Sequence, residues 1–212
     1  MNKNLTKWNL TLAVVLASAF TLQAADTLRY QAQPRGSKVS IDGTSSIHDW
    51  TVEGAVIGGF FEAAAAFKDD KSLKTAMEPA PKAEVVIPIR SLKSGKETMD
   101  GIMQDAMKMK ENPVIKYKLA EIKIKGEVPV SGTPVKFDSK GDLTVAGVTK
   151  PCAMEVTMER ADDGKLKFIG TTPIKMTDFE IKPPAPAIAG GLIKTGDDVT
   201  IKFEWVVAPK AQ

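Results

Sequence analysis

This chain of 212 residues has very little of the side chains on which most enzyme and metal sites depend: one cysteine, Cys152, and one histidine, His48. A single cysteine excludes an internal disulfide, so the fold must rest on its hydrophobic core. One histidine and one cysteine also fall short of the three or four ligands that zinc and copper sites take. The sequence therefore predicts no metal centre.

The sequence also lacks phosphate-binding glycine loops and a surplus of one charge. The pairs Gly58-Gly59 and Gly190-Gly191 do not fit the spacings G-x-x-x-x-G-K or G-x-G-x-x-G. The formal net charge is +3, whereas binding to nucleic acid needs a basic surplus on one face. We therefore expect no cofactor and no nucleic-acid partner.

Residues 1–24 have the layout of a secretory signal peptide. Lys3 and Lys7 precede a short apolar run, and small residues follow around Ala24. The apolar run is too short for a membrane span, which needs roughly 20 residues. Loss of this segment would lower the net charge from +3 to +1, because it takes two lysines and no acid. We expect a periplasmic or secreted protein with one domain over residues 25–212.

Short runs of alternating apolar and polar residues dominate the rest of the chain, which is typical of strands with one buried face. The clearest run puts five residues on one face: Val199, Ile201, Phe203, Trp205 and Val207. In VIKYKLAEIKI the phase shifts near Ala120, which indicates a bulge. Further runs are KVSID, HDWTVEGAV, AEVVIPI, GDLTVAG, CAMEVTME and KLKFIGTTPIKM. Eight or more such strands favour an all-β antiparallel barrel or sandwich.

One segment has helical rather than strand spacing. Its apolar residues recur every three or four positions: Met99, Ile102, Met103, Ala106 and Met107. Asn112-Pro113 then stops a helix, because the residue before proline is steered away from the helical region. The pattern predicts one amphipathic helix over about 96–110, with its methionine-rich face against the sheet. Segments 67–82 and 182–198 are expected to be long loops.

The stretch SSIHDW, residues 45–50, offers hydroxyls, a histidine and an acid. In an extended strand His48 and Asp49 would point to opposite faces, so the acid could not orient the histidine. No G-x-S-x-G elbow accompanies them. The sequence therefore predicts no catalytic site and no enzyme. The open interpretations are a histidine bonded to nearby backbone or serine at the start of a strand, and an anchor for the polar end of a ligand.

The apolar interior has two open interpretations as well. A closed eight-stranded barrel has room either for packed side chains or for one small ligand. Flexible methionines suit an adaptable cavity lining, but they also occur in ordinary cores. Cys152 falls in an apolar register, which favours a buried, inert thiol.

Four stretches in order resemble the YceI-like family of exported lipid-binding proteins. They are KVSIDGTSSIHDW, MDGIMQDAMKMKENPVIKY, GDLTVAGVTKP and TDFEIKPPAPAIAGGLIKTGDDVTIKFE. The resemblance implies a lipocalin-like, extended eight-stranded antiparallel barrel with one inserted amphipathic helix. It also implies a polyisoprenoid or similar long-chain amphiphile in the lumen. The family's Arg-Asp-x-His-Leu-like motif is replaced here by ETMDGIM, which keeps only Asp100.

On this interpretation the lumen binds an isoprenoid or fatty-acyl lipid for transport, storage or sequestration. The expected ligand-binding residues are Trp50, Met103, Met107, Tyr117, Leu143, Met154, Val156, Phe168, Phe203 and Trp205. The expected polar anchors near one end of the barrel are Ser45, His48 and Asp100. The apolar segment 185–192 is expected to form a lip or a membrane-touching rim.

A different class of function stays open. In it the core is filled by side chains, and the outer surface of the barrel docks to a membrane redox or stress-response partner in the periplasm. Transient membrane contact and a homodimer are also open at this stage.

Overall fold

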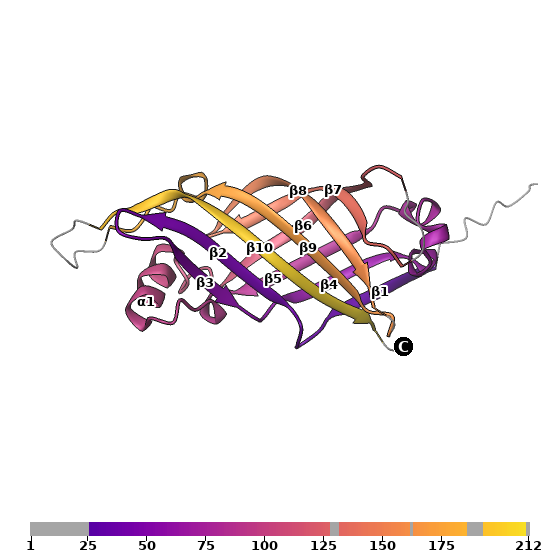
Figure 1. Cartoon of the computed structure of the whole chain (residues 1–212), viewed down its shortest axis with the longest axis horizontal. Coiled ribbons are helices and arrows are strands. Elements are labelled where there is room, and N and C mark those ends of the chain that lie inside the picture. The colour runs from indigo at the N-terminus through magenta and orange to yellow at the C-terminus, as the bar shows by residue number, and fades with distance from the viewer. Residues whose placement is uncertain (1–25, 128–131, 162, 186–192, 211–212) are drawn as a thin grey trace, which may run out of the picture.

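The computed structural model describes residues 26–127, 132–161, 163–185 and 193–210, and most of them lie in one large sheet (Figure 1). The strands are β1 (Thr27–Ala32), β2 (Lys38–Ser45), β3 (Trp50–Gly54), β4 (Gly58–Ala64), β5 (Lys82–Pro88), β6 (Val114–Ile124), β7 (Val135–Val145), β8 (Val148–Arg160), β9 (Leu166–Lys175) and β10 (Thr195–Pro209). The helical elements are η1 (Ala65–Lys68), η2 (Asp70–Ser72), η3 (Thr75–Met77), η4 (Ile89–Ser91), α1 (Glu97–Ala106) and η5 (Met176–Phe179).

Eight strands close into an antiparallel barrel. The sheet runs from β4 through β5, β6, β7, β8 and β9 to β10, and β1 pairs with both β4 and β10 to join the two ends. Tyr30 of β1 lies opposite Phe61 on β4 and Pro209 on β10, so one short strand carries the closure. The predicted eight-stranded antiparallel barrel is confirmed, and the sandwich alternative is wrong.

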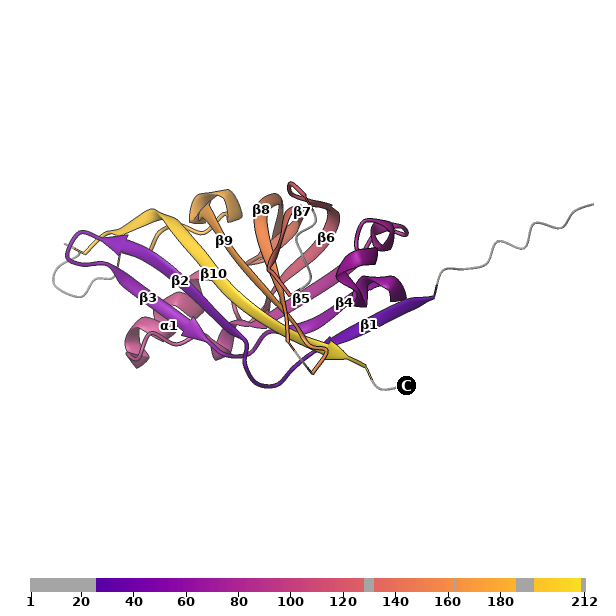
Figure 2. The same ribbon diagram turned by 45° about the vertical axis from the view of Figure 1, so that its right-hand side comes forward.

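The two remaining strands extend the barrel at one end. β10 is 15 residues long, and two strands share one of its edges. Its first part, Thr195–Glu204, pairs with β2, whereas Val207–Pro209 pairs with β1. β3 continues the sheet beyond β2. Figure 2 shows the β2–β3 hairpin running beside β10 toward the end of the barrel where α1 lies. The wall is therefore taller at this end.

The connection from β5 to β6 carries α1 and ties it to the free edge of β3. The Glu53 amide donates to the Lys93 carbonyl at 2.8 Å, and the Lys93 amide donates back to Glu53 at 2.7 Å. The helix is shorter than the predicted 96–110, because its last residue is Ala106. Lys108 then takes a left-handed backbone conformation, with φ of 52°, which ends the helix. The sequence pattern located this helix correctly but overran its C-terminus.

The opposite end of the barrel is covered by η1, η2 and η3 (Figure 1). The expectation of a polar loop over 67–82 is wrong, because Phe67, Leu73 and Ala76 are fully buried there. Arg160 donates from its guanidinium to the Phe67 carbonyl, and its Cζ lies 5.5 Å from the centre of the Phe67 ring. This end of the barrel is therefore closed by packed side chains.

An aromatic cluster fills the interior next to this closure. The Phe61 ring centre lies 5.0 Å from that of Phe67 and 4.9 Å from that of Phe168, with tilted planes in both pairs. Phe168 continues to Trp205 at 5.8 Å. Tilted contacts at these separations are favourable for aromatic rings. The cluster reaches from η1 to the middle of the barrel.

The strand registers agree closely with the alternation in the sequence. β7 alternates buried and more exposed residues along its whole length, with Val135, Phe137, Ser139, Gly141, Leu143 and Val145 inward. The register of β6 against β7 shifts between Leu119 and Glu121, which confirms the predicted bulge. Two strands were missed. β1 is short and polar, and β4 begins with two glycines, so neither shows a clear period of two.

Candidate functional site

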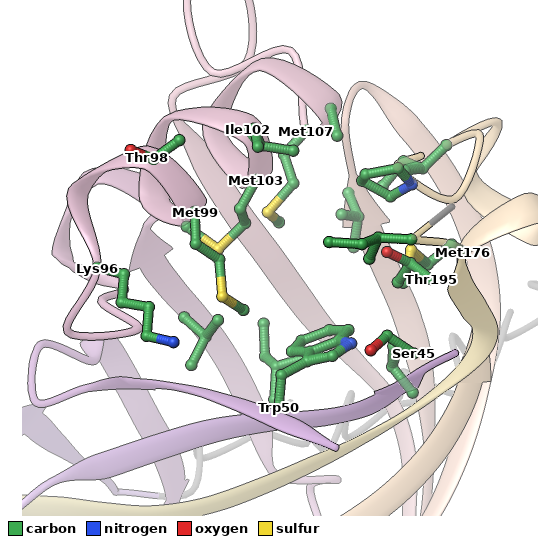
Figure 3. A pocket seen from close by; sticks show the side chains of 18 of the residues that line it. Ser45, Trp50, Lys96, Thr98, Met99, Ile102, Met103, Met107, Met176 and Thr195 are labelled. Atoms are coloured by element: carbon green, nitrogen blue, oxygen red, sulfur yellow. The ribbon is translucent and has the colours of Figure 1, made fainter. Parts of the chain in front are cut away.

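A cavity of about 520 Å³ lies inside the barrel at the end where α1 sits (Figure 3). Its walls come from segments far apart in the chain, chiefly β2, β3, α1, β10 and the stretch from the end of β9 through η5. Most of the lining is apolar: Ile41, Trp50, Val52, Ile102, Met103, Ile115, Val145, Ile174, Phe179, Ile181, Val199 and Ile201. The volume falls in the range of about 300–1,000 Å³ that is usual for small-molecule sites.

The methionine-rich face of α1 forms one wall. Met99 and Met103 project from the helix into the cavity, and Met107 does so from the position directly after it, across from Trp50 (Figure 3). Met107 is 7% exposed, whereas Met99 and Met103 are half-buried. Thioether side chains have several rotatable bonds and adapt to irregular neighbours. The predicted orientation of this helix toward the sheet is correct, but its face borders a cavity rather than a filled core.

Trp50 forms the opposite wall and is held there by two contacts. Its indole N–H donates to the Thr44 carbonyl at 2.9 Å. Its ring lies directly on Gly43, where a Cβ atom would come 2.2 Å from Trp50 Cζ2. Gly43 therefore has to be a glycine for the indole to lie flat on β2. The sequence placed Trp50 at the lumen, but it gave no sign of this dependence on Gly43.

Residues 46–49 of the SSIHDW stretch form the turn between β2 and β3. His48 and Asp49 therefore precede the strand, and the predicted strand run HDWTVEGAV began two residues too early. The Ser45 hydroxyl donates to the His48 carbonyl at 2.7 Å and accepts from the His48 amide at 3.2 Å. His48 Nδ1 lies 2.7 Å from the backbone carbonyl of Asp49, not from its carboxylate. Ile47 at the tip is 62% exposed. The stretch is locked by its own backbone and borders the cavity.

Six polar residues border the cavity, and we call them the polar rim. They are Ser45, His48, Lys96, Glu97, Thr98 and Thr195. Ser45 and Thr195 are half-buried, and the other four are exposed. The side chain of Lys96 lies along the edge of the cavity near Trp50 (Figure 3). The rim offers hydrogen-bonding groups to the outer end of a bound molecule, whereas most of the remaining lining is apolar.

Asp100 does not line the cavity, in contrast to its expected role as a polar anchor. It is 7% exposed, and its Oδ1 accepts hydrogen bonds from the amide and the hydroxyl of Ser94, both at 2.7 Å. Lys93 Nζ lies 3.4 Å from its Oδ2. The hydrogen bonds from Ser94 lower the pKa of Asp100, although burial opposes this shift. Asp100 therefore holds the turn before α1 in place.

A second, smaller space of about 120 Å³, which we call the inner chamber, lies deeper in the barrel. It shares Ile41, Ile115 and Ile201 with the first cavity, so the two spaces adjoin. Seven of the predicted ligand-binding residues line it: Tyr117, Leu143, Met154, Val156, Phe168, Phe203 and Trp205. The other three, Trp50, Met103 and Met107, line the larger cavity. The structure thus places all ten along one apolar interior.

Several residues that line the cavity were not predicted from the sequence. Met176, Phe179 and Ile181 follow β9 and turn back over the cavity through η5. Phe179 and Ile181 are buried. Their spacing fits neither a strand nor a helix, and no periodic signal marks them. On β2, Ile41 points inward, and the alternation of KVSID was sufficient to find it.

Two observations bear on whether the described residues could hold a metal ion or a reactive thiol. In the described ranges no group of three or more histidine, cysteine, aspartate and glutamate side chains is placed to hold a metal ion. Cys152 is buried, and burial raises the pKa of its thiol, although a contact with Thr172 opposes the shift. No described helix has the length and apolar character needed to cross a membrane. The predicted signal peptide, residues 1–24, lies outside the described residues, and so does the predicted lip over 185–192 except for its first residue.

An extended antiparallel barrel with an apolar cavity beneath a single helix belongs to the lipocalin-like class of β-barrels. The chain is a member of the YceI-like domain family, whose pattern matches residues 30–207. It is 29% identical over 180 residues to a UPF0312 protein of Vibrio parahaemolyticus. The match covers 80% of this chain and 85% of that protein.

Solved structures share this fold at low sequence identity. BcnA of Burkholderia cenocepacia matches with a TM-score of 0.60 at 20% identity, over 80% of this chain and 95% of BcnA. A polyisoprenoid binding domain of Saccharophagus degradans, implicated in plant cell wall breakdown, matches with a TM-score of 0.61 at 15% identity, over 86% of this chain and 99% of that domain. The likeness establishes the common barrel architecture.

Proposed function

We propose that this protein is an exported lipid-binding protein that holds a polyisoprenoid or long-chain acyl amphiphile in its barrel, for transport, storage or sequestration. The observation that carries the proposal is the continuous apolar interior, in which a cavity of about 520 Å³ adjoins an inner chamber of about 120 Å³. The polyisoprenoid binding domain of Saccharophagus degradans, which shares the fold, supports the same class of ligand.

The size of the space favours a ligand over a filled core. Protein interiors are close-packed, and few of their voids exceed the size of a water molecule. A cavity of about 520 Å³ is far larger than that. Apolar cavities stay dry when empty and take up apolar molecules readily. The alternative, a filled barrel that acts only through its outer surface, does not account for a cavity of this size.

The apolar walls supply enough free energy for binding without a precise polar contact. Each buried methylene contributes about 0.8 kcal/mol, so a chain that buries ~10 methylenes gains roughly 8 kcal/mol before the costs of association. Such a site discriminates chain length and bulk more strongly than chemical identity. The flexible methionines of α1 allow chains of different shape to pack.

The arrangement at the polar rim supports binding rather than catalysis. His48 meets the backbone carbonyl of Asp49, whereas a catalytic histidine needs a nucleophile and an orienting acid within hydrogen-bond reach. Ser45 and His48 remain proposed polar contacts for the outer end of the ligand, and Asp100 does not share this role. Export rests on the predicted signal peptide over residues 1–24.

Native mass spectrometry with added farnesol tests the proposal on a pair of matched variants. Ile201 lines both spaces, so Ile201→Trp should block the passage between them and reduce the bound fraction about tenfold. Lys202→Trp places the same side chain on the exposed face of β10, at the cost of one exposed ion pair with Asp42, and should bind like wild type. Equal binding by both variants, or no farnesol on the wild type, would contradict the proposal.

A further inference from the structure

The inner chamber contains two polar atoms whose hydrogen-bonding capacity is not used. The Tyr117 hydroxyl and the Trp205 indole N–H are both fully buried, and neither has a hydrogen-bond partner among the described residues. The tryptophan as a whole is 4% exposed. In native structures most buried polar groups are hydrogen-bonded, and each exception calls for an explanation, such as a functional role or a bound water or ion.

The residues around Tyr117 do not supply a hydrogen-bond partner for its hydroxyl. Its ring lies against Gly141, where a Cβ atom would come 2.6 Å from the Tyr117 hydroxyl oxygen. The nearby hydroxyl of Ser139 donates instead to the Met154 carbonyl, at 3.0 Å. The Ser139 hydroxyl lies close enough to the Tyr117 hydroxyl to lower its pKa, but the pair does not meet the geometry of a hydrogen bond. Burial raises the pKa of Tyr117 by a larger amount, so this phenol keeps its proton at neutral pH. Tyr117 therefore stays available as a donor.

The chamber is suited to a neutral partner. Among the described residues that line it, no acidic or basic side chain is present, and its polar members are Tyr117, Ser139, Thr172 and Trp205. An ionised head group would lose its hydration here without meeting an opposite charge. A carbonyl or ether oxygen loses much less, and it can accept hydrogen bonds from a phenol and an indole.

We propose that the inner chamber binds a neutral oxygen acceptor of the lipid, a carbonyl or ether oxygen, through the Tyr117 hydroxyl and the Trp205 indole N–H. The oxygenated end of the molecule then lies deepest in the barrel, and its hydrocarbon chain runs outward past Ile201 to the methionines of α1. A chamber of about 120 Å³ holds such an end group and not the whole chain. Met154 on the same wall is flexible enough to let the oxygen reach the donors. This inference rests on the proposed lipid-binding function and specifies the class of lipid.

Two probes of equal chain length test the assignment, methyl undecyl ketone and tridecane. Each is titrated as a competitor of anilinonaphthalene sulfonate, whose fluorescence reports occupation of the barrel. Wild type should bind the ketone more tightly than the alkane. Tyr117→Phe should lower the affinity for the ketone by about two- to tenfold, which is the usual contribution of one hydrogen bond. The affinity for the alkane should not change. Trp205→Phe should have the same selective effect.

A second readout separates this role from a purely structural one. Tyr117→Phe removes an unsatisfied buried donor, so the ligand-free variant should melt at the same temperature as wild type or higher. The matched control is Tyr30→Phe, the other tyrosine of the chain, which is buried outside the chamber and should leave the ratio of ketone to alkane affinity unchanged.

Two results would overturn the assignment: equal wild-type affinity for both probes, or equal loss of both in Tyr117→Phe. Failure of both probes to bind wild type would instead overturn the lipid-binding function itself.

Discussion

The two ends of this barrel are built from the same strands with the same alternation of side chains, yet one end is filled and the other is hollow. At the end under η1, the Phe61 ring packs on those of Phe67 and Phe168, with ring centres about 5 Å apart. Arg160 donates a hydrogen bond to the Phe67 carbonyl. At the end under α1, a cavity of about 520 Å³ is bordered mostly by aliphatic side chains and methionines, with Trp50 and Phe179 as its aromatic members.

A single strand shows how the difference arises. Along β10 the inward residues change from Val199 and Ile201, which line the cavity, to Phe203, Trp205 and Val207 nearer the filled end. The β2–β3 hairpin adds wall height only at the α1 end. Small inward residues and a taller wall together leave space there. We therefore expect stability to depend mainly on the filled end and ligand binding on the hollow end.

Truncation at the filled end should have the largest effect on stability. Phe61 is 1% exposed and touches the rings of Tyr30, Phe67 and Phe168. We expect Phe61→Ala to lower the free energy of unfolding by about 3–5 kcal/mol, since it removes a buried ring together with its contacts to three other rings. Urea denaturation followed by circular dichroism measures the change.

The partner of this experiment is Met103→Ala at the hollow end. Met103 is half-buried and already borders empty space, so its truncation should cost about 1 kcal/mol or less. Similar losses from the two substitutions would remove the contrast between a stability end and a binding end.

A loss of stability between those of Phe61→Ala and Met103→Ala is expected where a glycine supports the cavity wall. In Gly43→Ala the new methyl group would meet the Trp50 ring at 2.2 Å, so the indole must leave β2 and its hydrogen bond to Thr44. Overpacking of this kind typically costs about 1–3 kcal/mol. Urea denaturation should show the loss, and a red shift of tryptophan fluorescence should report the more exposed indole. An unchanged spectrum would mean that Trp50 is not fixed by Gly43.

The smallest expected effect is a pH dependence at the start of α1. Hydrogen bonds from Ser94, aided by Lys93, hold the pKa of Asp100 below the 3.8 of an ordinary aspartate. A lowered folded-state pKa stabilises the protein above the unfolded value, and this contribution is lost as the pH falls through the folded value. Asp100→Asn should therefore flatten the acid limb of a plot of urea midpoint against pH. Asp105→Asn, an exposed aspartate on the same helix, is the matched control. An acid limb as steep as in wild type would show that Asp100 does not contribute.

Local periodicity was sufficient to predict most of the sheet and the position of the helix. Val199 to Val207 fixed β10, and the phase shift at Ala120 located the bulge in β6. It was not sufficient where a residue's environment depends on distant segments. Phe67, Leu73 and Ala76 looked like parts of a loop, but they are buried because the barrel end needs a cover. His48 lies in a turn that is also hydrogen-bonded to a distant part of the chain, because the Ser46 amide donates to the Lys194 carbonyl and the Lys194 amide donates to the Ser46 hydroxyl.

The candidate site shows the same limit. Alternation identified which residues point inward, so all ten predicted ligand-binding residues border the interior. Whether that interior is hollow depends on the sum of side-chain volumes and on the extra wall from β2 and β3. Neither is visible in a single strand. Asp100 was assigned to the site by its motif, and only its contacts with Ser94 reveal a structural role.

The most direct test of a lipid-filled hollow end is native mass spectrometry of the protein purified from its own cells in mild detergent-free buffer, with no ligand added. We expect a population heavier than the bare chain by the mass of one long-chain lipid, which collisional activation releases. Ile201→Trp should lack this population, and Lys202→Trp should retain it. A wild-type protein that is repeatedly empty, and that takes up no prenyl chain when one is supplied, would contradict the account.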